Sequence, residues 1–227
     1  MPKTRRRLSL LSKAFALILC GVFGPNTAGA APLASAGDLP HPSYFGSTEI
    51  ENTRIAAFTK WTDMLARYRA EEASASVACT PTPVMPCFHK DWLALLASLK
   101  SRPEAEQIDA VNRAMNRGPY ITDPVNWGVP DYWATPDQFL RRDGDCEDYA
   151  IAKYLSLRQL GIPAERLRVV VLQDLNLGVA HAVLIVFLNG TPMLLDNQIT
   201  DVIPASAVHH YKPIYSINET AWWFHGN

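Results

Sequence analysis

The dipeptide Asn189-Gly190 lies between two apolar runs and constrains the fold more than any other local feature. Asn-Gly favours a two-residue turn that matches the twist of paired strands, so it predicts a hairpin of strands 181–188 and 191–197. If these residues form the turn, opposed positions sum to 379, as 189 and 190 do. Asp196 is then the diagonal neighbour of His181 on one face, and a slip of one residue would turn it away. The turn therefore predicts a His181–Asp196 pair.

A second constraint is the stretch Asp143-Gly144-Asp145-Cys146-Glu147-Asp148, which sets a thiol among acids at the predicted start of a helix. The unpaired N–H groups and the macrodipole at a helix N-terminus favour a thiolate. Crowded carboxylates oppose it, since two charges about 5 Å apart repel by roughly 3 kcal/mol at an effective dielectric near 20. A bound calcium ion would relieve this repulsion and order the loop. The alternative is a solvated cluster of charges in the first helical turn.

Residues 1–30 have the pattern of a secretion signal, in which basic residues precede an apolar run and Ala28-Gly29-Ala30. The run is shorter than the roughly 18 residues that a membrane span needs. The chain has 21 basic and 22 acidic residues, and loss of the signal removes five basic ones, leaving 16 against 22, a net charge of −6. With no basic patch interleaved with aromatics, nucleic acid is not an expected partner.

The cysteine count then becomes informative, because export implies an oxidising compartment. The mature chain keeps Cys79, Cys87 and Cys146. Cys79 and Cys87 flank a short proline-broken stretch, so we expect them to form a disulfide. Cys146 is left unpaired, and catalysis is the leading explanation for a lone thiol in an exported protein. Its neighbours Asp145 and Glu147 do not resemble the surroundings of a buried, inert cysteine.

Cys146, His181 and Asp196 together predict a cysteine triad, in which the thiol attacks a carbonyl, the imidazole takes and returns the proton, and the carboxylate orients the imidazole. A histidine at the start of a strand is more often structural. The in-register aspartate and the unpaired cysteine favour catalysis here. A zinc site is the competing interpretation, but no C-x-x-C pair lies near Cys146 and the other histidines are scattered or in loops.

The N-terminal half shows helical periodicity, whereas the region after residue 167 shows strands, which predicts an α+β fold with N-terminal helices packed on an antiparallel sheet. We expect residues 31–46 to form a tail and residues 47–227 a single domain. Three helices are predicted before residue 119: one from Ser47 or Thr48 to Tyr68, one through Trp92, Leu96 and Leu99, and one from Pro103 to Gly118.

Residues 119–134 are irregular, because prolines and a glycine interrupt any continuous helix. Long loops inside compact domains are usually functional. We expect this segment to form one wall of a substrate cleft, with Trp127, Tyr132 and Trp133 as apolar contacts. The alternative is that these rings only fill the core.

Several motifs resemble those of a known family. Gly144-Asp145-Cys146 at a helix start, Leu160-Gly161-Ile162-Pro163 at its end, and strands carrying His181 and Asp196 resemble the transglutaminase-like branch of papain-fold cysteine proteases. Further segments are similar to bacterial periplasmic proteases of the LapG type: Asp131-Tyr132-Trp133-Ala134-Thr135-Pro136, Asp145-Cys146-Glu147-Asp148-Tyr149-Ala150 and Leu195-Asp196-Asn197. The resemblance covers roughly residues 44–224.

This resemblance implies a papain-like, transglutaminase-like fold and a calcium-dependent endopeptidase of the periplasm. Such proteases cut a large surface adhesin near its N-terminus and release biofilm cells. An inner-membrane cyclic di-GMP receptor of the LapD type holds them inactive. The resemblance places calcium ligands at Asp145, Glu147 and Asp148. The residues alone leave open an amidase or acyltransferase, for instance one acting on peptidoglycan, and a non-catalytic calcium-dependent binding module.

Overall fold

A computed structural model describes residues 43–74 and 87–226 of the protein. The expected signal peptide, the expected tail up to residue 42 and Cys79 lie outside these ranges. Cys87 is disulfide-bonded, and its pairing with Cys79 stays a prediction. Within the described ranges, no helix combines the length and the apolar character needed to cross a membrane.

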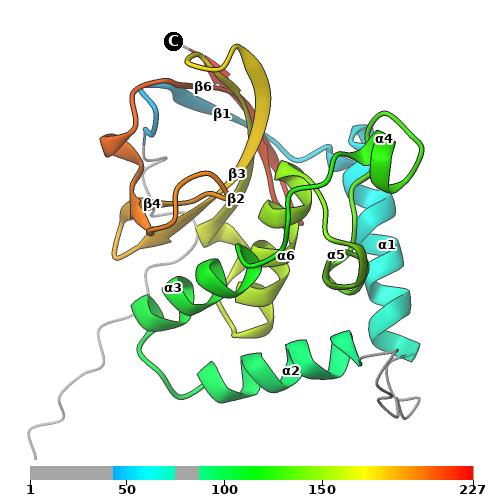
Figure 1. The fold of residues 1–227 in the computed structure, drawn as a ribbon. Helices are drawn as coiled ribbons and strands as arrows, with labels where there is room; N and C mark the ends of the chain where they lie inside the picture. The colour runs from blue at the N-terminus through cyan, green and yellow to red at the C-terminus, as the bar shows by residue number, and fades with distance from the viewer. Residues whose placement is uncertain (1–42, 75–86, 227) are drawn as a thin grey trace, which may run out of the picture. The chain divides into compact units, whose positions relative to one another are not determined.

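A seven-stranded antiparallel sheet forms one layer of the fold (Figure 1). The strand order is β1-β7-β6-β2-β3-β4-β5, which places β2 and β3 near the centre. The first strand therefore pairs with the last one, and the edges are β1 and β5. The strands are β1 (Thr48–Asn52), β2 (Leu167–Asp174), β3 (Val179–Leu188), β4 (Thr191–Leu195), β5 (Ile203–Pro204), β6 (Tyr211–Ile217) and β7 (Trp222–Gly226).

The helices form the second layer and gather on one side of the sheet (Figure 1). α6 packs against β3 and β2 and also contacts α3 and α5, so it is the central helix. This arrangement confirms the predicted α+β class. The helices are α1 (Thr59–Ser74), α2 (Phe88–Leu99), α3 (Glu104–Met115), α4 (Asp123–Asn126), α5 (Pro136–Arg142) and α6 (Cys146–Gln159), with short 3-10 turns η1 (Ile55–Ala57), η2 (Ala164–Arg166) and η3 (Ala205–Ala207).

The two central strands are buried on both faces, which explains their nearly continuous apolar sequences. Val169 and Leu184 belong to the larger hydrophobic cluster, which includes the apolar side chains of the helices. Val170 and Ile185 alternate with them and belong to a second cluster with Tyr44. The packed region therefore reaches back to Tyr44, ahead of the domain start predicted at residue 47.

The predicted hairpin register is confirmed. Leu188 pairs with Thr191, and the pairing continues to Leu184 opposite Leu195, so every opposed pair sums to 379. Asn189 and Gly190 have φ angles of 50° and 80°, the positive values that this turn requires.

The prediction of one helix from residue 47 or 48 to Tyr68 is wrong at its start. Residues 48–52 form the edge strand β1, and the helix α1 begins at Thr59. β1 pairs with β7, which is 170 or more residues away in the chain, so local periodicity carries no sign of it. Its burial is also inverted, because Glu49 is buried while Ile50 is 61% exposed.

A buried polar network explains why Glu49 faces inward. The Tyr44 hydroxyl donates to Glu49 Oε1 at 2.6 Å, and the Ser216 hydroxyl donates to the same oxygen at 3.0 Å. Arg168 Nε lies 3.4 Å from that oxygen. His225 on β7 contacts both Tyr44 and Ser216, at 3.2 and 3.0 Å. The network thus ties the N-terminal edge strand to the C-terminal strand.

We expect this network to make stability depend on pH. Burial lowers the pKa of His225 from its ordinary value to about 4; the charge of Glu49 opposes this shift and that of Arg168 adds to it. The unfolded chain then binds a proton near pH 6.5 while the folded chain does not, so the free energy of unfolding falls as pH drops from about 6.5 to about 4. After allowance for partial solvent screening, the loss should be on the order of 1–2 kcal/mol. Urea unfolding of the wild type and of His225→Gln across this range measures it, and equal pH dependence in both proteins would contradict the assignment.

Candidate active site

A sharp loop between α5 and α6 presents the candidate nucleophile. Asp143 ends α5 with a positive φ of 58°, and Cys146 is the first residue of α6. Gly144 between them packs tightly on the first turn of α6, since a Cβ built there would lie 2.7 Å from the Cβ of Asp148. Its carbonyl accepts the backbone N–H of Ile121 at 2.9 Å, which joins the irregular segment 119–134 to this loop.

Three aspartates around this loop share one arrangement. Asp145 Oδ2 accepts the backbone N–H of Asp123 at 3.2 Å, Asp148 Oδ1 accepts that of Ala134 at 2.6 Å, and Asp123 Oδ2 accepts that of Tyr132. The second oxygen of each carboxylate is buried and, among the described residues, has no hydrogen-bond partner. One oxygen from each aspartate lies within 4.8 Å of the others. These acids fit a cation that prefers oxygen ligands, such as calcium.

The acid cluster differs in part from the set predicted as calcium ligands. Asp145 and Asp148 meet as expected, but the third member of their group is Asp123. Glu147 lies in an overlapping group with Asp123 and Asp131, and Asp131 also pairs with Lys60. Sequence reasoning missed Asp123 and Asp131, because an irregular segment has no periodicity that marks Asp123 as buried or shows that Asp131 lies near it.

Burial dominates the electrostatics of these acids. It raises the pKa of Asp148 to about 9, of Glu147 to about 8 and of Asp123 to about 6, and each neighbouring carboxylate adds to the rise. Buried, like-charged groups resist ionisation unless a positive charge compensates them. The crowding predicted from the sequence is therefore present, and the alternative of a solvated surface cluster does not fit Asp148, which is fully buried.

Cys146 is a free, partly buried cysteine. Its thiol donates to Glu147 Oε2 at 3.1 Å, and the backbone N–H of Ala182, the residue after His181, points at the sulfur. Burial raises the pKa of the thiol well above its usual range, and the charges of Glu147 and Asp145 add to this effect. The helix N-terminus alone therefore does not produce the predicted thiolate, because burial and the acidic neighbours outweigh it.

His181 and Asp196 form the pair that the hairpin register predicts. His181 Nε2 lies 2.9 Å from Asp196 Oδ1, and both side chains are buried. The Tyr211 hydroxyl donates to Asp196 Oδ2 at 2.6 Å, and the backbone N–H of Gln198 donates to Oδ1 at 2.9 Å. Burial opposes ionisation of Asp196, but these hydrogen bonds and the His181 charge lower its pKa overall. Sequence reasoning missed Tyr211, because β6 reaches the site only through the sheet.

The aromatic residues of the irregular segment fix that segment to the helices. Trp127 and Tyr132 stack with ring centroids 4.4 Å apart, with Arg142 over the first ring and Arg67 over the second. Trp133 is buried and belongs to the main hydrophobic cluster. It also lines a pocket of about 260 Å³ together with Asp131. Their predicted substrate contacts stay a prediction, and packing accounts for most of the surface of Trp133.

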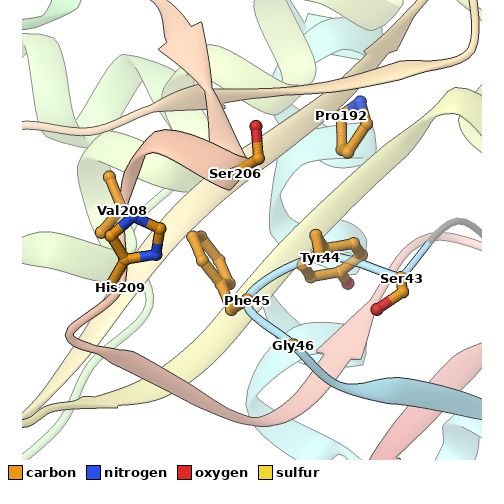
Figure 2. A pocket seen from close by; sticks show the side chains of 8 residues that line it. All are labelled: Ser43, Tyr44, Phe45, Gly46, Pro192, Ser206, Val208 and His209. Atoms are coloured by element: carbon orange, nitrogen blue, oxygen red, sulfur yellow. The ribbon is translucent and has the colours of Figure 1, made fainter.

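A separate pocket of about 480 Å³ lies away from these residues. Ser43, Tyr44, Phe45 and Gly46 line it from one side, and Pro192, Ser206, Val208 and His209 from the other (Figure 2). It contains none of the candidate catalytic or acidic residues, so we do not assign the active site to it.

Comparison with known proteins gives a consistent result. Residues 91–225 match the family described as bacterial transglutaminase-like cysteine proteinase. The structure of Legionella pneumophila LapG shares 37% identity, with a TM-score of 0.54 over 59% of this chain and 76% of that chain. Its calcium-bound structure shares 33% identity, with a TM-score of 0.58 over 69% of this chain and 87% of that chain. An EGTA-treated structure of the same protein shares 37% identity, with a TM-score of 0.54 over 59% and 74%. No curated protein matches.

The close packing of Gly144 leads to a test of the loop. We expect Gly144→Ala to lower the free energy of unfolding by about 1–3 kcal/mol, because the added methyl group must displace the backbone or the start of the Asp148 side chain. Thermal and urea unfolding measure the change. Gly226→Ala is the control, since a Cβ there meets nothing within 4 Å. Equal stability of the two variants would show that the loop adapts and that its packing does not fix Asp148.

Proposed function

This chain belongs to the bacterial transglutaminase-like cysteine proteinases, and we propose that it is a calcium-dependent cysteine endopeptidase that uses Cys146, His181 and Asp196 as its catalytic residues. The observation that carries this proposal is the buried His181–Asp196 hydrogen bond at 2.9 Å. A free cysteine, Cys146, stands at the start of α6. The thiol lies against the backbone N–H of Ala182, next to His181 in the chain.

The roles follow from this geometry. Because Nε2 of His181 binds Asp196, Nδ1 is the ring nitrogen left for the thiol proton. The sulfur would attack the peptide carbonyl while His181 takes its proton, and the imidazolium would return that proton to the leaving amine. Water then attacks the thioester, with His181 again accepting a proton, and releases the acid and the thiol. Asp196, held by Tyr211, fixes the tautomer of the imidazole and stabilises its charged form.

Asp123, Asp145 and Asp148 would hold the calcium ion through their unpaired oxygens, with Glu147 and Asp131 adjacent. The ion would supply positive charge beside the thiol. That charge would offset the neighbouring carboxylates, which add to the effect of burial in raising the pKa of Cys146. The calcium-bound and EGTA-treated structures of Legionella LapG support this part of the proposal.

The substrate and the partner rest on the family resemblance of the sequence. We propose that the enzyme is exported to the periplasm and cleaves the N-terminal region of a large cell-surface adhesin, which would release the adhesin and promote biofilm dispersal. An inner-membrane cyclic di-GMP receptor of the LapD type would be its inhibitory partner. A protein substrate needs a surface beside Cys146 on which to bind. Segment 119–134 would supply that surface, since its Ile121 is hydrogen-bonded to the loop that carries Cys146.

Loss of the nucleophile tests the catalytic assignment. We expect Cys146→Ala to abolish cleavage of the N-terminal region of an adhesin from the same genome, and Asp196→Asn to slow cleavage by at least about 100-fold, because the imidazole loses its orienting charge. Electrophoresis of the two fragments over time measures the rates.

Asp63→Asn is the control for this experiment, because this acid is exposed on α1 and belongs to neither acidic group. Cleavage by Cys146→Ala at the wild-type rate would rule out the mechanism. A wild type that hydrolyses peptidoglycan amides but leaves the adhesin intact would instead favour the amidase alternative.

Removal of calcium tests the metal assignment. We expect EGTA to lower both the melting temperature and the cleavage rate, and calcium to restore them, since an ion at 100 times its dissociation constant stabilises the folded state by about 2.7 kcal/mol. Asp148→Asn and Asp123→Asn should lose this calcium-dependent shift, whereas Asp63→Asn should keep it. Magnesium should restore little, because it demands a smaller octahedral site. If the melting temperature of every protein is the same with EGTA and with calcium, the acids do not bind calcium and have a purely structural role.

A further inference from the structure

The buried face of α6 contains an ionisable residue, Lys153, that the proposed mechanism does not use. Lys153 follows Cys146 by two helical turns, so it lies on the same side of α6. Its side chain is completely buried. Among the described residues, its Nζ atom has no hydrogen-bond partner. A buried ammonium without a partner is unfavourable, and an apolar side chain of similar length would pack there at lower cost.

The charge that acts on Lys153 is that of Asp196, the proposed triad carboxylate. Burial lowers the pKa of Lys153 to about 7, and the attraction of Asp196 opposes this shift. Below that pH the side chain is therefore an ammonium that stabilises the ionised form of Asp196. The Tyr149 ring on the same helix lies 5.9 Å from Nζ.

The loop after Asp196 is held by uncharged groups of α3, the helix packed on α6. Asn116 donates to the carbonyl of Asp196 at 2.7 Å, and Asn112 donates to the carbonyl of Thr200 at 2.9 Å. The side-chain oxygens of Asn112, Asn116 and Asn197 are buried acceptors without a partner among the described residues. These three unpaired acceptors therefore lie in or against the loop that begins at Asp196.

We propose that Lys153 is a positioning residue of the active site, whose ammonium holds Asp196 and its loop in the ionised arrangement that orients His181. This inference rests on the proposed function, because it assigns Lys153 a role in the same triad. The groups that face Asp196 are Lys153 from α6, His181 from β3, Tyr211 from β6 and the amide of Asn116 from α3. Tyr211 and Asn116 are neutral, and His181 gains its charge by taking the thiol proton. Among these groups, Lys153 is therefore the one that can carry a positive charge before the reaction begins.

The test uses the mature protein with calcium and follows alkylation of Cys146 by iodoacetamide, by intact mass, between pH 3 and pH 9. This probe reports the activated thiol without a known substrate. In Lys153→Met we expect the acidic limb of the rate profile to move up by about 0.5–1 pH unit, because Asp196 loses the positive charge that favours its ionised form. At pH values below the midpoint of the wild-type limb, the rate should fall by about 3- to 10-fold. Lys153→Arg keeps the positive charge, so its acidic limb should stay at the wild-type pH.

Stability separates positioning from packing. A lysine whose pKa is lower in the folded state costs stability below its ordinary pKa, and this cost is complete below about pH 7. Lys153→Met should therefore melt at or above the wild-type temperature at pH 6 while its alkylation profile shifts. Lys90→Met, an exposed position on α2, is the matched control and should change neither.

Each remaining outcome counts against the inference. A Lys153→Met profile that superimposes on the wild type would overturn it, as would a uniform loss of rate with a lowered melting temperature and no shift of the limb. If wild type and His181→Ala react alike at every pH, the proposed triad fails and the inference fails with it. If His181→Ala slows alkylation but Lys153→Met reacts like the wild type at every pH, the triad stands and this inference alone is overturned.

Discussion

Burial of like-charged carboxylates at the start of α6 is the constraint on which the rest of the site depends. Asp123, Asp145 and Asp148 each use one oxygen to bind a backbone N–H and leave the other unpaired. These bonds fasten the irregular segment 119–134 to the helix that carries Cys146. Isolated buried charges are unfavourable, so a cation that compensated them would also influence the state of the neighbouring thiol.

The sheet supplies the other half of the site, and strand register determines its geometry. The turn at Asn189-Gly190 fixes the register of β3 and β4, and this register sets Asp196 on the face that carries His181. The site thus combines a rigid pair, set by strand pairing, with a thiol whose chemistry depends on the charges around it. In our proposal Lys153 connects the two halves, because it lies on the helix of Cys146 and its charge acts on Asp196.

The residue patterns that predicted the structure well were local. The motif Leu160-Gly161-Ile162-Pro163 marks the end of the helix of Cys146 as expected, and Gly161 there has a φ of 100°. Features that depend on contacts between distant parts of the chain were not predicted. β1 was assigned to a helix because its partner β7 lies at the other end of the chain, and Asp123 was missed because only packing reveals that an aspartate in a loop is buried.

The sequence by itself determined the start and end of the helix of Cys146, the hairpin register and, through that register, the His181–Asp196 pair, because helix-end and turn chemistry and period-two alternation act over a few residues. It also marked Cys146 as a thiol among acids. Only the tertiary structure decided which acids converge, that Tyr211 binds Asp196, and that Lys153 is buried without a partner. The physical reason is that burial and charge compensation depend on segments far apart in the chain, and no local pattern encodes which of them will meet.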